Sequence, residues 1–326
     1  MLKTLQSLRF LFALLIFLSH FDYAGTPLLA SGGDCGVAFF LCLSGCLLAK
    51  KHGESIDNRT FSPRRFLLKR LAAIYPLHLL CLVASLLLWP QPLDWKVLAN
   101  LLLVQSWIPD ADCYFGCNSV SWFLSALMFG YIVFPWLYRA KVRWLLPAMA
   151  TAYLTTVLLV PEADINRFLY VNPLVRTVDL YVGISLWRLG RHIGKLPRPT
   201  LLEALCLAMV AVALASYPHV APKFGNAPLY WLAVAPVLLV FSEQSGWFSR
   251  VLESGGLVAL GNLSLPFFMT HKMVIALVLG ALRHTGFRPP NLAVLAICLL
   301  LALLVSWLVD RWFLRPIQGL AHCRRQ

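Results

Sequence analysis

The sequence predicts an all-α protein, a polytopic membrane helix bundle of about ten transmembrane helices. Two observations lead to this fold class. Of the 326 residues, 60% are hydrophobic and only 13% are charged, whereas a soluble domain carries roughly 25% charged residues. Apolar runs near the length of about 20 residues that spans a bilayer recur along the whole chain. We therefore expect a single membrane domain over residues 1–326.

Ten segments are apolar and long enough to be candidate spans. In chain order they are 5–21, 36–50, 67–89, 119–138, 144–160, 173–190, 200–217, 227–241, 262–282 and 291–310. Residues 96–108 are apolar but too short to span, so a re-entrant or interfacial piece is expected there. We interpret the first segment as a retained helix rather than a signal peptide. Arg9 interrupts its apolar run, and no small-x-small cleavage site follows Phe21.

The basic residues predict the orientation of this bundle. The chain has 28 Lys and Arg against 14 Asp and Glu, a net charge of +14. With the ten spans placed as above, 21 basic residues fall on one side, five on the other, and Arg176 and Lys272 lie within spans. Cytoplasmic loops carry such an excess, so both ends are expected in the cytoplasm. No basic stretch interleaves aromatic residues as a nucleic-acid groove would, so no nucleic-acid partner is expected.

The nine cysteines show no metal-ligand spacing, and no metal site is expected. Cys42 and Cys46 lie inside an apolar segment and are interpreted as packing residues. Cys113 and Cys117 lie in a polar loop. If that loop is extracytoplasmic, they could pair with each other, or one could pair with Cys35. The sequence leaves these alternatives open.

Ionisable side chains within the bilayer are costly and are functional candidates. Arg9 and His20 lie eleven residues apart in the first segment. At 100° per residue they fall about 20° apart around the helix and about 16 Å apart along it. This geometry suits a ligand that crosses the membrane with its anionic end at Arg9, since Arg binds phosphate in a planar bidentate manner. The alternative is a pair of interfacial anchors at the two helix ends.

Three further polar pairs lie within predicted spans. Arg176 and Asp179 are three residues apart, so they can form an ion pair on one helix face, and a structural bridge is favoured over a substrate contact. The other pairs are His271 with Lys272, and Trp122 with Ser125. Each pair alone is a weak functional signal. Trp122, for example, could simply mark a membrane interface, as Trp often does.

Six segments form an ordered series of motifs. They are 5–20, with its basic residue and His; 36–45; 69–76; 121–135; 172–183; and 261–271. Taken together, the series resembles the membrane acyltransferase family called acyltransferase 3 over almost the whole chain. Four positions depart from that family's pattern. Ala38 replaces an Asp, Ala73 the second arginine, Leu127 an acidic residue and Asp179 a Glu.

The resemblance implies transfer of an acyl group, usually acetyl, from cytoplasmic acetyl-CoA to a hydroxyl of a cell-surface or lipid-linked carbohydrate. It implies a multi-pass protein of the inner (plasma) membrane, with the lipid bilayer as its environment. Acetyl-CoA is then a substrate, and no permanently bound cofactor is expected. The sequence specifies no oligomeric state, and no appended hydrolase-like domain is expected.

On this interpretation, CoA phosphates bind at Arg9 and Arg70, and the thioester reaches a catalytic His20. His20 either deprotonates the acceptor hydroxyl or carries the acyl group itself, and the sequence does not separate these two routes. Acceptor contacts or structural roles are assigned to five other residues, with His271 expected to pack or to position the acceptor. The five are Trp122, Ser125, Arg176, Asp179 and His271.

Two other functions are compatible with a chain of this kind. The first is a transporter of a lipid-linked sugar or another solute, without acyl transfer. Internal repeats would favour it, but the two halves differ in spacing and motifs. The second is an inactive family member that acts as an assembly partner. Consumption of a thioester by the purified protein distinguishes the enzyme from both.

Overall fold

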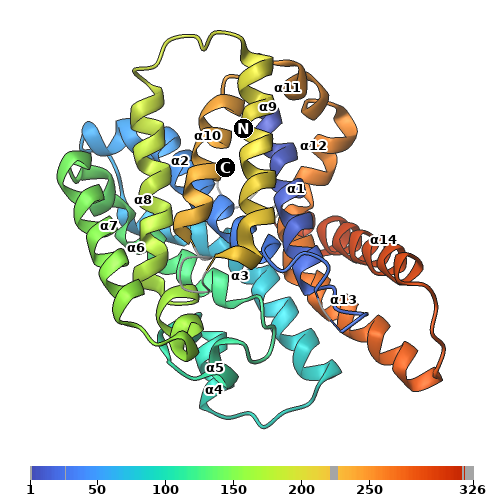
Figure 1. Cartoon of the computed structure of the whole chain (residues 1–326). Coiled ribbons are helices and arrows are strands. Elements are labelled where there is room, and N and C mark those ends of the chain that lie inside the picture. Colours follow the sequence, from blue (N-terminus) through green and yellow to red (C-terminus); the bar gives the residue numbers. More distant parts are fainter. Residues whose placement is uncertain (1, 26, 221–226, 318, 320–326) are drawn as a thin grey trace.

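A computed structural model of the chain describes residues 2–25, 27–220, 227–317 and 319 (Figure 1). Within these ranges the regular structure is helical and contains no strand, which confirms the predicted all-α class. Side chains are described for these ranges except at 227 and 228. Three of the 28 basic residues that predict the orientation lie outside them, namely Lys223, Arg324 and Arg325. The chain end at Gln326 lies outside them too.

Within the described ranges, ten long helices overlap the ten segments predicted from the sequence. They are α1 (Lys3–His20), α2 (Gly32–Asp57), α3 (Pro63–Leu88), α6 (Trp122–Arg139), α7 (Val142–Leu159), α8 (Pro173–Gly190), α9 (Pro199–Ser216), α10 (Ala227–Phe241), α13 (Ser264–Thr285) and α14 (Asn291–Val309). In the described part of the chain, six segments are long and apolar enough to cross a membrane. These six are 32–57, 63–88, 142–159, 199–219, 264–285 and 291–317.

Shorter helices connect the long ones. They are α4 (Trp95–Leu101), η1 (Gln105–Trp107), α5 (Ala111–Tyr114), η2 (Glu162–Asp164), η3 (Asn166–Tyr170), η4 (Tyr217–His219), α11 (Trp247–Leu252), α12 (Gly255–Asn262) and η5 (Asp310–Leu314). The segment 96–108 is divided between α4 and η1 and forms no long helix, as its length predicted. Figure 1 shows α4 and α5 at one end of the bundle and α11 with the α8–α9 connection at the other.

The outer surface of the bundle is apolar in a way that suits lipid rather than water. Large hydrophobic side chains are exposed on several of the long helices, among them Leu87 on α3, Leu159 on α7 and Leu292 on α14. Soluble monomers rarely expose large contiguous apolar patches. Because the exposed residues sit on helices whose backbone groups are bonded internally, they can face acyl chains without leaving polar groups unpaired.

Helix α2 lies at the centre of the bundle and packs mainly against α8, α1 and α10. Two glycines allow α2 and α8 to approach closely. A Cβ atom on Gly45 would lie 1.9 Å from the carbonyl oxygen of Leu180, and one on Gly183 would lie 1.8 Å from that of Cys42. Small residues at such crossings are characteristic of helix packing in membranes. The α2–α8 contact forms the central helix pair, and α1, α3 and α13 are arranged around it.

Helix α1 is anchored by hydrogen bonds near its first turns. The Thr4 hydroxyl donates to the Phe241 carbonyl at 2.8 Å, and the Gln6 amide donates to the Asn262 side chain at 2.7 Å. The opposite half of α1 packs against α13, where the rings of Phe17 and Phe267 lie 5.7 Å apart. The two ends of α1, and so Arg9 and His20, are therefore held by different neighbours.

The cysteines of the described residues are free thiols. Cys113 is buried and Cys117 is half-buried, and neither is bonded to the other or to Cys35. The Gln91 amide donates to the Cys117 sulfur at 3.0 Å. Cys42 and Cys46 are buried in the helix core, as expected for packing residues. The loop that contains Cys113 is instead held by Lys96, whose ammonium lies 3.0 Å from Asp110.

Candidate functional site

Arg9 and His20, the two residues of α1 predicted to act in the site, open onto different cavities. Arg9 lines a large cavity of about 630 Å³, which we call the basic cavity. His20, at the last position of α1, lines two smaller cavities of about 250 and 390 Å³. The rise of about 1.5 Å per residue places the two side chains about 16 Å apart along the helix. One straight helix thus joins two chemically different sites.

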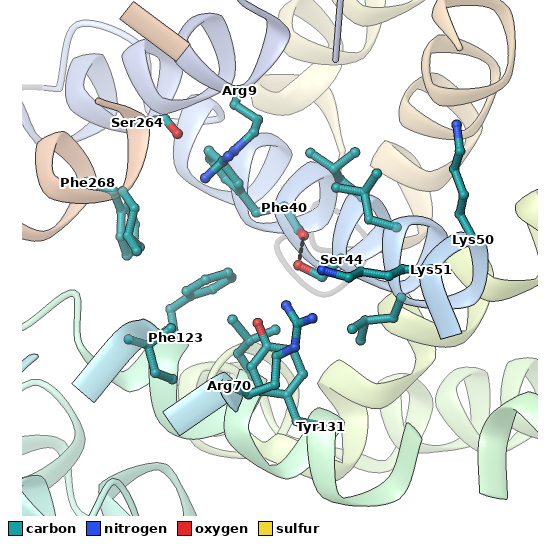
Figure 2. Close-up of a pocket in the computed structure, with 16 residues that line it drawn as sticks. Arg9, Phe40, Ser44, Lys50, Lys51, Arg70, Phe123, Tyr131, Ser264 and Phe268 are labelled. Carbon is teal, nitrogen blue, oxygen red and sulfur yellow. Dashed lines mark hydrogen bonds between the residues drawn. The ribbon is translucent and has the colours of Figure 1, made fainter. Parts of the chain in front are cut away.

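The basic cavity collects cations from three helices. Figure 2 shows Arg9 of α1, Lys51 of α2 and Arg70 of α3 pointing into the same space from three directions. Lys50 also borders the cavity but points away in Figure 2, and its ammonium lies 5.5 Å from the centre of the Trp187 ring. Among the described residues that line this cavity there is no carboxylate. A cavity of this charge favours an anionic group.

The rest of the basic cavity is apolar and aromatic. Its wall is completed by leucines and an isoleucine, by two serines and by four aromatic rings. These residues are Phe40, Leu43, Ser44, Leu47, Leu48, Ile74, Phe123, Leu127, Tyr131, Ser264, Leu265 and Phe268. Small-molecule sites typically combine such an apolar lining with a few polar groups that fix orientation. This cavity therefore suits a ligand with a charged end and a less polar remainder.

Arg70 is held in place by stacking rather than by an acidic partner. Its guanidinium lies over the rings of Phe66 and Tyr131, with centroid distances of 5.3 and 5.8 Å. One terminal nitrogen lies 3.3 Å from the ring nitrogen Nε2 of His52. The Nε atom of Arg70 is buried without a hydrogen-bond partner among the described residues. An unsatisfied buried donor needs an explanation, and a bound anion would supply one.

His20 is in direct contact with a second histidine. Its Nδ1 atom lies 2.9 Å from Nε2 of His271 on α13. His271 is fully buried, and its Nδ1 atom lies 2.8 Å from the Phe268 carbonyl oxygen and 3.3 Å from that of Phe267. The sequence suggested packing or acceptor positioning for His271. The structure places it against the residue predicted to be catalytic.

His20 borders both smaller cavities, and these differ in polarity. The central cavity, of about 250 Å³, is mostly apolar and carries one further charged residue, Lys272. The acidic cavity, of about 390 Å³, carries the carboxylates of Asp34 and Glu162 and the hydroxyl of Tyr170. Tyr170 lines both cavities. A reacting molecule at His20 would therefore meet groups from both sides.

A phenylalanine borders both the basic cavity and the central one. Phe268 lines both cavities and therefore lies next to each of them. Phe123 lies 5.3 Å from it and Phe40 lies 6.4 Å from it, measured between ring centroids. Both of these rings line the basic cavity. The three cavities thus follow one another along α1, from Arg9 past Phe268 to His20.

Trp122 lies near His20, whereas Ser125 does not line these cavities. Trp122 lines the central cavity together with His20, and its ring packs against Tyr170 at 4.7 Å. The Ser125 hydroxyl instead accepts from the backbone amide of Ser106 at 3.4 Å. The Ser106 hydroxyl in turn donates to the Trp122 carbonyl at 2.8 Å. Ser125 therefore joins η1 to α6 and supports the position of Trp122.

Arg176 and Asp179 form the ion pair that their spacing predicted. The guanidinium NH1 lies 3.0 Å from an Asp179 oxygen, and both side chains are buried. Arg176 also donates to the Leu169 carbonyl at 2.8 Å, and the Trp231 indole donates to the other Asp179 oxygen. These bonds connect α8 with η3 and α10. A buried pair bonded on both sides supports the structural interpretation rather than a substrate contact.

Three of the departures from the family pattern occupy distinct environments. Ala38 is buried in an apolar cluster that includes Leu8 and Phe12. Leu127 lines the basic cavity, which therefore lacks an acidic group at this position. Ala73 is exposed on α3 and is not among the residues that line the cavity. The basic cavity is thus more uniformly cationic than the family pattern would make it.

Sequence reasoning missed several residues of these cavities. Lys51 directly follows the predicted span 36–50, which suggests only a loop charge, yet it points into the basic cavity. Lys272 was noted as an intramembrane cation, a signal of function in itself, but not placed beside His20. Phe268 carried no signal as one of many apolar residues. Asp34 and Glu162 lie 128 positions apart in the sequence, so no local pattern indicates that they share one cavity.

Comparison with known proteins gives a consistent result. A protein-family profile described as "Acyltransferase domain" matches residues 2–311. The chain is 28% identical over 313 residues to the protein named Acyltransferase MdmB from Streptomyces mycarofaciens. This alignment covers 84% of the present chain and 79% of that protein. No solved structure matches.

Proposed function

Since the chain belongs to the acyltransferase family whose profile spans residues 2–311, we propose that it is a membrane O-acyltransferase with acyl-CoA as its donor. The acyl group is most simply acetyl, and the acceptor is a hydroxyl of a cell-surface or lipid-linked carbohydrate. The observation that carries the proposal is the arrangement along α1. A cationic cavity at Arg9 leads past Phe268 to a histidine that borders two further cavities.

The basic cavity supports an acyl-CoA donor. CoA carries phosphates, and guanidinium groups bind phosphate through paired, charge-assisted hydrogen bonds. Arg9, Lys51 and Arg70 supply three cations in one space (Figure 2). The apolar wall suits the uncharged pantetheine arm, which extends from the phosphates toward the thioester. The excess of basic residues on this side of the bundle favours the cytoplasm, where CoA thioesters are found.

The acidic cavity supports a hydroxyl-rich acceptor. Its lining combines the carboxylates of Asp34 and Glu162 with the hydroxyls of Tyr170 and Tyr217. Such groups accept and donate hydrogen bonds to several hydroxyls at once. His20 lies at the boundary of this cavity. An acceptor bound there would present a hydroxyl to the imidazole from the side opposite the donor.

The chemistry proposed at His20 is transfer of an acyl group from the sulfur of the CoA thioester to the oxygen of the acceptor hydroxyl. As a general base, His20 takes the proton of the acceptor hydroxyl while the oxygen attacks the thioester carbonyl carbon. The carbon–sulfur bond breaks, and the CoA thiolate recovers the proton. As a covalent carrier, His20 attacks the thioester carbonyl carbon and the CoA thiolate leaves. The acceptor oxygen then attacks the acyl carbon, the carbon–nitrogen bond to His20 breaks, and the hydroxyl proton goes to the thiolate. Lys272 borders the central cavity together with His20 and can stabilise negative charge on the carbonyl oxygen of the thioester.

Membrane vesicles of defined orientation, prepared from cells that make the glycan acceptor, test donor use and orientation together. Acetyl-CoA does not cross a sealed membrane, so release of its free thiol should occur with inside-out vesicles and not with right-side-out vesicles. Opening the right-side-out vesicles with detergent should restore it. Vesicles without the protein provide the background rate. Absence of thiol release in both orientations and after opening would favour the transporter function instead.

A further inference from the structure

The hydrogen-bond partners of His271 determine where its proton lies. The Nδ1 atom is 2.8 Å from the carbonyl oxygen of Phe268 and 3.3 Å from that of Phe267. A carbonyl oxygen can only accept a hydrogen bond, so Nδ1 must carry the hydrogen. The ring is fully buried, with the rings of Phe17, Phe267 and Phe268 centred about 6 Å away. Among apolar groups a charged imidazole would lose its hydration, so the neutral form is favoured.

A neutral imidazole with hydrogen on Nδ1 has a lone pair on Nε2. The Nε2 atom of His271 therefore accepts in its 2.9 Å contact with His20, and His20 Nδ1 donates. The proton of neutral His20 is then on Nδ1, and its Nε2 atom holds the lone pair. The chain of donors runs from His20 through His271 to the Phe268 backbone, which the helix α13 holds rigidly.

We propose that His271 is a positioning residue that holds His20 as the Nδ1–H tautomer, so that Nε2 is the reactive nitrogen. This inference rests on the proposed function and deepens it. Both routes of acyl transfer require a lone pair on the nitrogen that meets the substrate. As base, Nε2 takes the hydroxyl proton and returns it to the CoA thiolate. As carrier, Nε2 attacks the thioester carbonyl carbon, and the thiolate leaves. In hydrolytic triads a third group holds the catalytic histidine in the same way.

The arrangement also explains why Phe268 has two contacts in the site. Its carbonyl oxygen accepts from His271, and the residue lines both the basic and the central cavity. The Phe268 ring can move when the acyl arm passes without moving the Phe268 carbonyl, because the backbone of α13 fixes that carbonyl. The tautomer of His20 is thus held independently of the ring that the donor must pass.

The tautomer can be measured without any acyl transfer. In the full chain labelled with ¹⁵N-histidine and placed in lipid vesicles, magnetic resonance distinguishes a protonated from an unprotonated ring nitrogen. The signals of His20 are identified as those lost in His20→Ala. We expect them to show hydrogen on Nδ1 in the unsubstituted protein and a shift toward hydrogen on Nε2 in His271→Met. Hydrogen on Nε2 in the unsubstituted protein, or no change in His271→Met, would overturn the proposal.

Kinetics of two matched variants distinguish positioning from packing. Gln and Met have similar length and volume, but only Gln places a strong acceptor near the position of Nε2. We expect His271→Gln to keep kcat within about tenfold of the unsubstituted protein. His271→Met should lower kcat by about 10²-fold, because the general-base contribution is partly lost. The Kd for acetyl-CoA should be unchanged in both variants, since the basic cavity is intact.

Equal loss of kcat in His271→Gln and His271→Met, at unchanged Kd and abundance, would assign His271 to packing and overturn the proposal. If the unsubstituted protein released no thiol at all, the proposed function would fail. The resonance experiment would still report the tautomer, so the two failures are distinguishable.

Discussion

Replacement of His20 by alanine is expected to lower the rate of acyl transfer by about 10²–10⁴-fold if His20 acts as general base. The loss would be greater if His20 carries the acyl group. The reason is geometric: His20 is the imidazole that borders both the central and the acidic cavity. The Kd for acetyl-CoA should change little, because Arg9 and Arg70 are untouched. Thiol release by the purified protein in lipid vesicles measures the rate, and equilibrium binding of labelled acetyl-CoA measures the Kd.

His192→Ala is the matched control, since His192 is exposed and lines none of the three cavities described. It should retain normal turnover. Rapid quenching with labelled acetyl-CoA in the absence of acceptor then separates the two routes. Label recovered on His20 would indicate the covalent carrier. Its absence, in a preparation that turns over normally once acceptor is supplied, would indicate the base. Near-normal turnover in a folded His20→Ala variant would contradict the mechanism.

Replacement of either arginine of the basic cavity is expected to weaken donor binding strongly. Arg9→Ala and Arg70→Ala each remove a charge-assisted phosphate contact, worth about 1.5–3 kcal/mol. This corresponds to an increase of about 10–150-fold in the Kd for acetyl-CoA. At saturating donor, thiol release should fall much less than the Kd rises, because His20 is unaffected. Equilibrium binding of labelled acetyl-CoA to the purified variants measures the effect.

Two further variants sharpen this prediction. Arg70→Lys keeps the charge but loses the planar guanidinium that stacks on Phe66 and Tyr131, so it should restore binding only in part. Arg64→Ala is the control, because Arg64 lies on the same helix but is exposed and does not line the cavity. It should bind acetyl-CoA normally. Unchanged Kd values in both cavity variants would remove the support for a CoA phosphate site.

The helices could be predicted from the sequence because their signal is local. Each long helix coincides with an apolar run, and the short segment at 96–108 was excluded by its length. The boundaries were less predictable. Helix α2 extends from Gly32 to Asp57, well beyond the apolar run 36–50, because its polar ends form turns that hydropathy does not detect. The packing of α2 on α8 through Gly45 and Gly183 also depends on which helices meet, which composition does not specify.

The residues of the candidate site likewise fall into those that a local sequence pattern predicts and those that it does not. The common face of Arg9 and His20 follows from helical periodicity, and the ion pair of Arg176 with Asp179 follows from their spacing. The contact of His20 with His271 joins residues 251 positions apart, so no local pattern could show it. Lys51 and Phe268 were missed for the same reason: their roles arise only when α2, α3 and α13 come together around one cavity.

The most direct test of the central claim is the acyl content of cell-surface glycans from matched cells. One strain produces the unsubstituted protein, and another produces His20→Ala at equal abundance in the membrane. Mass analysis should find an ester-linked acyl group, most simply acetyl, on a glycan hydroxyl of the first strain and not of the second. Mild alkali should remove this difference. Identical acyl content in the two strains, together with a change in the amount of exported glycan, would contradict acyl transfer and identify the protein as a transporter.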